Sequence, residues 1–169
     1  THDLGIDKEN IVVVPTGLWY SIGSFKQELL DNPNIVSVSA TTQAPVDFAW
    51  LSGFHWGGMD SQDTIQACMF WVDEDFAKTY NIEMVKGEFL RQNYSDFWEK
   101  NEQAYKDKQA GKSYAVSLPV VINEAFAKQM NVEDPIGMRL NNSSVIIGVA
   151  KNFHFRPLHN RIEPMVMLN

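Results

Sequence analysis

The apolar runs of this chain are short, and this feature limits its folds more than any other. The longest are residues 11–14 and 145–149, each about a quarter of the roughly 20 apolar residues that a helix needs to cross a bilayer. Both are rich in β-branched residues, which is typical of strands. The 169 residues are therefore expected to form a globular core of short strands and helices, with no membrane-spanning segment.

Two β-α-β units are expected in the first half of the chain. In the first, the run 11–15 and the alternating run 35–42 are strands on either side of an amphipathic helix that Ser24 caps. In the second, the apolar run 65–72 and the extended segment 82–86 flank a short helix. Such units predict an α+β fold, with a split β-α-β sheet and helices on one face.

The second half is expected to open with an exposed helix between residues 94 and 111, in which Glu102 stands four residues before Lys106. A strand at 119–122 then leads into a helix that Asn123 caps. The remaining predicted strands are 145–149 and 165–168.

The charge balance argues against nucleic acid as a partner. The net charge of −7 comes from 21 acidic and 14 basic residues, and no cluster of lysines and arginines could neutralise several phosphates. The single cysteine, Cys68, cannot form an internal disulfide and is expected to be a small buried apolar residue.

Catalytic and metal-binding patterns are not recognisable. The chain has no Gly-x-Ser-x-Gly elbow, no phosphate-binding loop and no dinucleotide-binding turn. His154 and His159 are close in sequence, but Pro157 breaks any helix that would bring both to one metal. The acidic run 73–75 lacks the glycine and glutamate of a calcium loop, so we interpret it as a helix cap. We predict no enzymatic activity, no cofactor and no structural metal.

The most unusual composition lies in the loop expected from 43 to 63. Its large aromatic residues are Phe48, Trp50, Phe54 and Trp56. Aromatic side chains at this density need a surface to pack on, which is either the protein's own core or a partner. Nearby glycines favour a surface excursion, so we expect at least one of the two tryptophans to be exposed. The four aromatic residues are candidate partner contacts.

Seven phrases of the sequence, in the same order, resemble the MacB-like periplasmic core domain of FtsX-type ABC transporter permeases. The most specific is the segment 147–155, which reads IGVAKNFHF. The first and last phrases look most like the second of two such domains in permeases with eight membrane helices. The seven phrases stand at residues 4–14, 32–39, 72–89, 121–125, 134–137, 147–155 and 158–164.

The resemblance implies a two-part domain. A porter-like subdomain would comprise residues 1–90 and 156–169, interrupted by a smaller, mainly β Sabre-like subdomain of residues 91–155. Membrane helices would directly precede Thr1 and follow soon after Asn169. Because both ends would return to one membrane surface, we expect the termini to lie close together.

The resemblance also implies a function and a set of partners. The chain would be the extracytoplasmic, periplasmic domain of an inner-membrane permease and would couple cytoplasmic ATP hydrolysis to the handling of a substrate or partner outside the membrane. Its partners would be the permease's own membrane helices, a second permease copy or domain, a periplasmic partner or substrate and, indirectly, the cytoplasmic ATPase subunit. The alternatives are a free periplasmic or surface module that binds glycans or peptides through the aromatic loop, and an enzyme with an unrecognised site.

Overall fold

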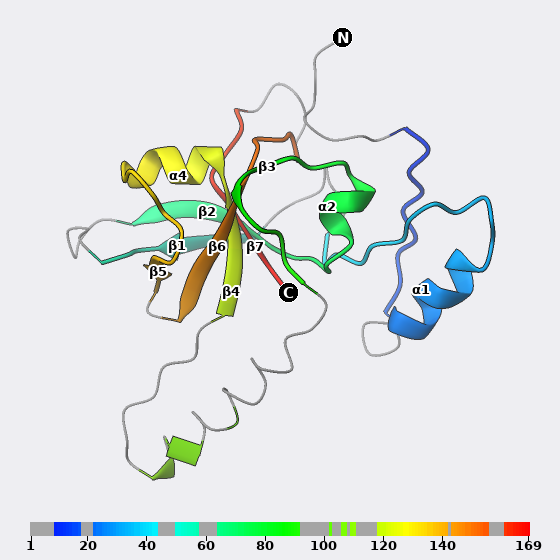
Figure 1. Cartoon of the computed structure of the whole chain (residues 1–169), viewed down its shortest axis with the longest axis horizontal. Helices are drawn as coiled ribbons and strands as arrows, with labels where there is room; N and C mark the ends of the chain where they lie inside the picture. Colours follow the sequence, from blue (N-terminus) through cyan, green and yellow to red (C-terminus); the bar gives the residue numbers. More distant parts are fainter. Residues whose placement is uncertain are drawn as a thin grey trace.

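The computed structural model describes ten stretches of the chain. They are residues 9–17, 22–43, 50–57, 64–91, 102, 106–107, 109–110, 118–141, 143–155 and 161–169. Their helices and strands (Figure 1) are, in order, α1 (Ile22–Leu30), β1 (Trp50–Phe54), β2 (Ile65–Trp71), α2 (Phe76–Thr79), β3 (Met84–Gly87), β4 (Leu118–Asn123), α4 (Glu124–Met130), β5 (Arg139–Leu140), β6 (Ser144–Ala150) and β7 (Met165–Leu168).

Within these stretches the strands form one seven-stranded mixed sheet in the order β1-β2-β7-β4-β6-β3, with β5 paired to β6. β7 is parallel to β2 and antiparallel to β4, while β4 is parallel to β6. The C-terminal strand therefore lies in the middle of the sheet. All of its residues are buried, which explains why it reads as a continuous apolar run and not as an alternating one.

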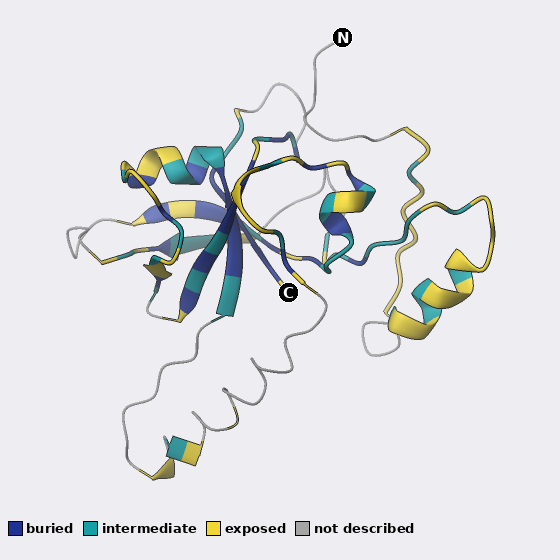
Figure 2. Ribbon diagram, in the orientation of Figure 1, coloured by how far each residue is buried: buried dark blue, intermediate teal, exposed yellow. Residues whose placement is uncertain are grey.

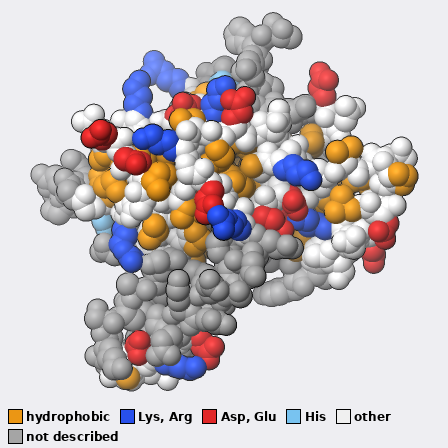
Figure 3. Space-filling model, viewed as in Figure 1, with side chains coloured by type: hydrophobic (Ala, Val, Ile, Leu, Met, Phe, Trp, Pro, Cys, Tyr) orange, Lys and Arg blue, Asp and Glu red, His pale blue; other side chains and the backbone are white. Residues whose placement is uncertain are grey.

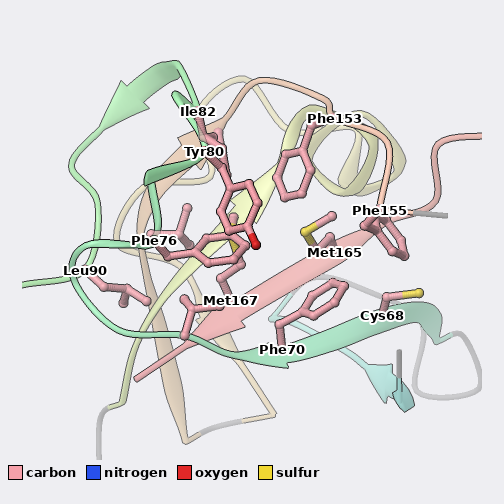
Figure 4. Close-up of a cluster of buried hydrophobic side chains, with 13 residues drawn as sticks. Cys68, Phe70, Phe76, Tyr80, Ile82, Leu90, Phe153, Phe155, Met165 and Met167 are labelled. Atoms are coloured by element: carbon pink, nitrogen blue, oxygen red, sulfur yellow. The ribbon is translucent and has the colours of Figure 1, made fainter. Parts of the chain in front are cut away.

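The two faces of the sheet carry separate buried clusters. Alternation along β7 sends Met165 and Met167 into one cluster and Val166 and Leu168 into the other. The α2-side cluster (Figure 4) consists of Cys68, Phe70, Val72, Phe76, Tyr80, Ile82, Leu90, Val121, Ala150, Phe153, Phe155, Met165 and Met167. The α4-side cluster consists of Phe54, Ile65, Ala67, Val120, Ile122, Phe126, Met130, Leu140, Ile146, Val149, Val166 and Leu168. The α+β class is confirmed, but α2 and α4 cover opposite faces instead of the single face expected.

The end of β1 curls back to meet β5. Trp56 forms an antiparallel bridge with Leu140, and the Asn141 amide N–H donates to the carbonyl of His55 at 2.9 Å. The Asn141 side chain accepts from the His55 N–H at 3.0 Å and donates to the Gly53 carbonyl at 3.1 Å. These contacts join β1 to β5 and so close a ring of strands around the α4-side cluster.

Asn123 joins three parts of the fold. It is fully buried, and its Oδ1 accepts from the amide of Phe126 at 3.0 Å, which caps α4 as the sequence predicted. The same oxygen accepts from the Met165 amide at 2.9 Å, and Nδ2 donates to the Glu163 carbonyl at 2.9 Å. One side chain thus fixes the start of α4 and the entry into β7.

A pair of glycines lets β3 approach β6 closely. Gly87 and Gly148 are directly paired, and Gly87 has a positive φ of 66°. A Cβ atom on Gly148 would collide with the carbonyl oxygen of Glu88, and one on Gly87 would collide with that of Ile147. Neither position tolerates a side chain without movement of the backbone.

The N-terminal part of the chain lies beside the sheet and not in it. Residues 11–17 and 35–40 are extended but belong to no strand, so the strands expected at 11–15 and 35–42 are wrong. This part of the chain meets the sheet where Ile11 packs against the α2-side cluster and where Thr41 forms a bridge with Val72, at the end of β2. Figure 2 shows this region and α1 as mostly exposed, with Val12 83% exposed.

The predicted strands 65–72, 82–86, 119–122, 145–149 and 165–168 are confirmed as β2, β3, β4, β6 and β7. The sequence missed β5, and it missed β1 because that strand falls in the segment taken for a loop. Most of the helix expected at 94–111 lies outside the described residues. Its Glu102–Lys106 ion pair is present, with nitrogen and oxygen 2.7 Å apart.

The strands of residues 1–90 and 156–169 were also expected to form one sheet, apart from the strands of residues 91–155. That separation is wrong. β4 and β6 come from the stretch assigned to the inserted subdomain, yet they lie between β7 and β3 in a single hydrogen-bonded sheet. The division of the chain at residues 91 and 156 stays a prediction. The expected closeness of the termini also stays a prediction, because residues 1–8 lie outside the described part.

Candidate functional site

The four aromatic residues of the predicted partner contact do not form one surface. Trp50 begins β1 and is 67% exposed, so the expectation that at least one tryptophan is exposed is confirmed. Phe54 ends β1 as a buried residue and packs edge-on against Phe126, with ring centroids 5.8 Å apart. Trp56 is half-buried against the α4-side cluster, and Phe48 lies outside the described residues.

A second tryptophan lies on the same face of the sheet as Trp50. Trp50 is directly opposite Met69 in the β1–β2 register, and Trp71 stands two residues farther along β2. Because side chains two residues apart in a strand share a face, Trp71 lies on the same face as both. Trp71 is 38% exposed, and Leu51 is 57% exposed on the other face. We call Trp50, Leu51 and Trp71 the hairpin patch.

The hairpin patch lies at one edge of the described sheet. β1 comes first in the strand order, and its residues Trp50–Phe54 pair with β2 alone. Sequence reasoning did not single out Trp71, because the run 65–72 is apolar at nearly every position and was expected to be covered on both faces. Large aromatic side chains at an exposed sheet edge are typical anchors of a protein or peptide partner.

A hollow of 510 Å³ lies in the N-terminal part of the chain, and we call it the N-terminal groove. It is lined by residues 12–17 and 38–43, by Ile22, Phe25 and Leu29 of α1, and by Tyr80. Figure 3 shows hydrophobic atoms reaching the surface, between charged ones, on the side where α1 lies. Within the described residues, Gln43 Oε1 is a buried acceptor without a hydrogen-bond partner. Burial raises the pKa of Tyr80.

The acidic run 73–75 meets a lysine from α1, which sequence reasoning missed. The ammonium of Lys26 lies 2.7 Å from Asp73, 2.6 Å from Asp75 and 3.7 Å from Glu74. We call these four residues the clasp. Burial by itself would lower the pKa of Lys26, but the hydrogen bonds to Asp73 and Asp75 and the nearby negative charges outweigh it and raise that pKa.

The interpretation of this run as a helix cap holds in part. Asp75 is the N-cap residue of α2 and its side chain makes no capping hydrogen bond, but Asp73 Oδ1 accepts from the Asp75 amide at 3.2 Å. Asp73 is also a junction: its carboxylate accepts from Ser39 Oγ and from the Ala40 amide, each at 2.7 Å, as well as from Lys26. The run therefore joins α1 and the segment after it to the end of β2.

The remaining residues that sequence reasoning weighed do not come together as a site. His154 is half-buried, and His159 lies outside the described residues. Cys68 is fully buried, as predicted, and its thiol donates to a Glu163 carboxylate oxygen at 3.3 Å. In the part of the chain that the structure describes, no three histidine, cysteine or acidic side chains are grouped to hold a metal ion. No helix in that part is long and apolar enough to cross a membrane.

Comparison with known proteins identifies the fold through structure and not through sequence. No family model matches the chain, and no curated protein does. The structure is similar to the periplasmic region of MacB from Actinobacillus actinomycetemcomitans, with a TM-score of 0.52 and 15% identity over 86% of this chain and 53% of that one.

Two further solved structures are similar to this chain with lower TM-scores. The extracellular domain of the noncanonic ABC-type transporter YknZ from Gram-positive bacteria has a TM-score of 0.43 and 10% identity, over 92% of this chain and 68% of that one. A domain of a protein described as a permease from Porphyromonas gingivalis has a TM-score of 0.46 and 16% identity, over 79% and 50%. The chain spans about half the length of the MacB and Porphyromonas structures. The structural similarity to MacB shows that this chain has the fold of the MacB periplasmic region, as the resemblance in its sequence implied.

Proposed function

We propose that this chain is the extracytoplasmic domain of an ABC transporter permease of the MacB type and that it has no catalytic role of its own. It would stand on the periplasmic face of the inner membrane and couple ATP hydrolysis by a cytoplasmic subunit to the handling of a substrate or partner outside. The observation that carries this proposal is the similarity to the MacB periplasmic region over 86% of the chain. Because one fold can serve several functions, the activity itself needs a direct test.

The hairpin patch is the surface through which we propose that the domain contacts its periplasmic partner or substrate. Trp50, Leu51 and Trp71 are exposed, and in the described sheet β1 pairs with no second strand over Trp50–Phe54, where Asn141 occupies the Gly53 carbonyl. A partner can use both features, because aromatic anchors supply apolar contact and an edge strand supplies backbone hydrogen bonds. Phe54 has no part in this contact because it belongs to the core.

The test uses the product of the complete gene that carries this domain. If the proposal is right, that product fractionates with the membrane and copurifies with an ATPase subunit, whose ATP turnover responds to the periplasmic partner. Trp50→Ala should abolish or weaken that response while leaving basal turnover unchanged. Val85→Ala is a matched control, because Val85 is also an exposed apolar residue but lies on β3, at the other end of the sheet.

The same experiment distinguishes the second candidate, a free module that binds glycans or peptides. The exposed tryptophans of the hairpin patch favour this alternative, since indole rings are common binding platforms. A gene product that stays out of the membrane fraction and copurifies with no ATPase would overturn the permease proposal. Loss of glycan or peptide binding in its Trp50→Ala variant would then establish the alternative.

A further inference from the structure

α1 is attached to the rest of the molecule without burying any residue. None of Ile22–Leu30 is buried, although Ile22, Phe25 and Leu29 form an apolar stripe. An amphipathic helix normally packs such a stripe on the core. Here the stripe faces the N-terminal groove, a hollow of 510 Å³, so apolar packing contributes little to holding α1 in place.

The polar side-chain contacts that hold α1 against the rest of the described molecule all come from one residue. In the stretch of helix that the structure describes, every side-chain hydrogen bond and ion pair to the rest of the molecule is made by Lys26. Its side chain is only 12% exposed, and it lies among the carboxylates of Asp73, Glu74 and Asp75. An ion pair this far from solvent is screened much less than one on the surface.

The segment that follows α1 is fixed independently of Lys26. The amide of Thr42 donates to the Trp71 carbonyl at 2.9 Å, and the Asp73 amide donates to the Ala40 carbonyl at 3.0 Å. Ser37 and Thr79 share a hydrogen bond of 2.6 Å. Between this fixed segment and α1 lies the turn at 31–34, which separates the contacts of the helix from those of residues 37–42.

We propose that α1 is a lid over the N-terminal groove and that the clasp holds it shut. Opening breaks the contacts of Lys26, exposes the lining of the groove and leaves the seven-stranded sheet folded. Asp73 keeps its hydrogen bonds to Ser39 and Ala40 when the lid is open, which keeps the acidic half of the clasp in position for reclosure. This inference concerns a movement inside the domain and does not depend on the proposed transport function.

Amide hydrogen exchange of the isolated chain tests the lid, because it measures local opening separately from global unfolding. In Lys26→Met, exchange at residues 26–30 should accelerate about tenfold or more, since a half-buried cation paired with several carboxylates is lost. Exchange in β4 and β6 should not change. Lys78→Met is the control: Lys78 is an exposed lysine of α2 outside the clasp and should leave α1 exchange unaltered.

Two results would overturn the proposal. Unchanged exchange in α1 of Lys26→Met would show that the clasp does not hold the helix. Equal acceleration in α1, β4 and β6 would show that Lys26 supports the whole fold and not a lid. If Lys26→Met does not fold, Asp75→Ala removes the 2.6 Å contact and keeps the Asp73 junction. It should then accelerate exchange in α1 alone, and uniform or absent acceleration would again refute the lid.

Discussion

Replacing Asn123 with alanine should destabilise the domain far more than the loss of an ordinary helix cap. The substitution removes the acceptor for the Phe126 amide, which is worth about 1 kcal/mol for a typical cap. It also leaves the buried Met165 amide without this acceptor, at a cost of about 1–3 kcal/mol, and removes one hydrogen bond from the half-buried Glu163 carbonyl. Because these effects share one site and do not simply add, we expect a total loss of about 3 kcal/mol.

Urea denaturation monitored by tryptophan fluorescence measures this loss. The midpoint should fall with an unchanged slope, because the folded and unfolded states expose the same surface as in the wild type. Asn123→Ser can keep the cap but not all three hydrogen bonds, so it should lie between wild type and alanine. Asn32→Ala, in an exposed turn, is the control and should change stability by less than about 0.5 kcal/mol.

A loss of only about 1 kcal/mol in Asn123→Ala, together with almost no loss in Asn123→Ser, would refute the reasoning. It would mean that Asn123 acts as a helix cap alone and that the contacts with Glu163 and Met165 contribute nothing. A steeper or shallower slope would instead show that the surface exposed on unfolding had changed, in the folded or the unfolded state.

The remaining predictions concern β6, the clasp and the hairpin patch. Gly148→Ala should lower stability by about 1–3 kcal/mol in thermal melting, because the new methyl group meets the Glu88 carbonyl; unchanged melting would contradict the close approach. Since folding raises the pKa of Lys26, its stabilising effect is complete below the usual value of 10.5 and is lost as pH rises through the higher folded pKa. The stability difference between wild type and Lys26→Met should therefore stay constant up to about pH 10 and shrink above it, and a difference that shrank at neutral pH would be inconsistent with this. Trp50→Ala should change stability by less than about 0.5 kcal/mol, whereas Phe54→Ala should cost about 3–5 kcal/mol; comparable losses in chemical denaturation would disprove the assigned exposures.

Composition predicted the buried strands well and the exposed ones poorly. β2, β4, β6 and β7 are apolar runs bounded by turns, and burial on both faces leaves that pattern in any sequence. Residues 11–14 have the same β-branched composition, but within the described residues they pair with no strand and so form none themselves. β1 contains Ser52 and Gly53 at its centre and resembles a loop, and only its pairing with β2 makes it a strand.

The candidate site was predicted in part. The exposure of Trp50 followed from the glycines around it, because such a loop favours the surface. The clasp could not be predicted, since Lys26 and Asp73 are 47 residues apart and nothing local to the acidic run indicates a lysine on another helix. Long-range ion pairs depend on how separate elements pack, which local patterns do not encode.

The central position of β7 bears on how the chain folds as it is synthesised. β7 is the strand that joins the β1–β2 hairpin to the group formed by β4, β6, β5 and β3. Until residues 165–168 pair with their neighbours, the folding chain therefore holds two groups of strands, each with an unpaired edge at the place of β7. Exposed strand edges of this kind attract other chains, so the interval before the last strand arrives is when the domain is most exposed to aggregation and most dependent on chaperones.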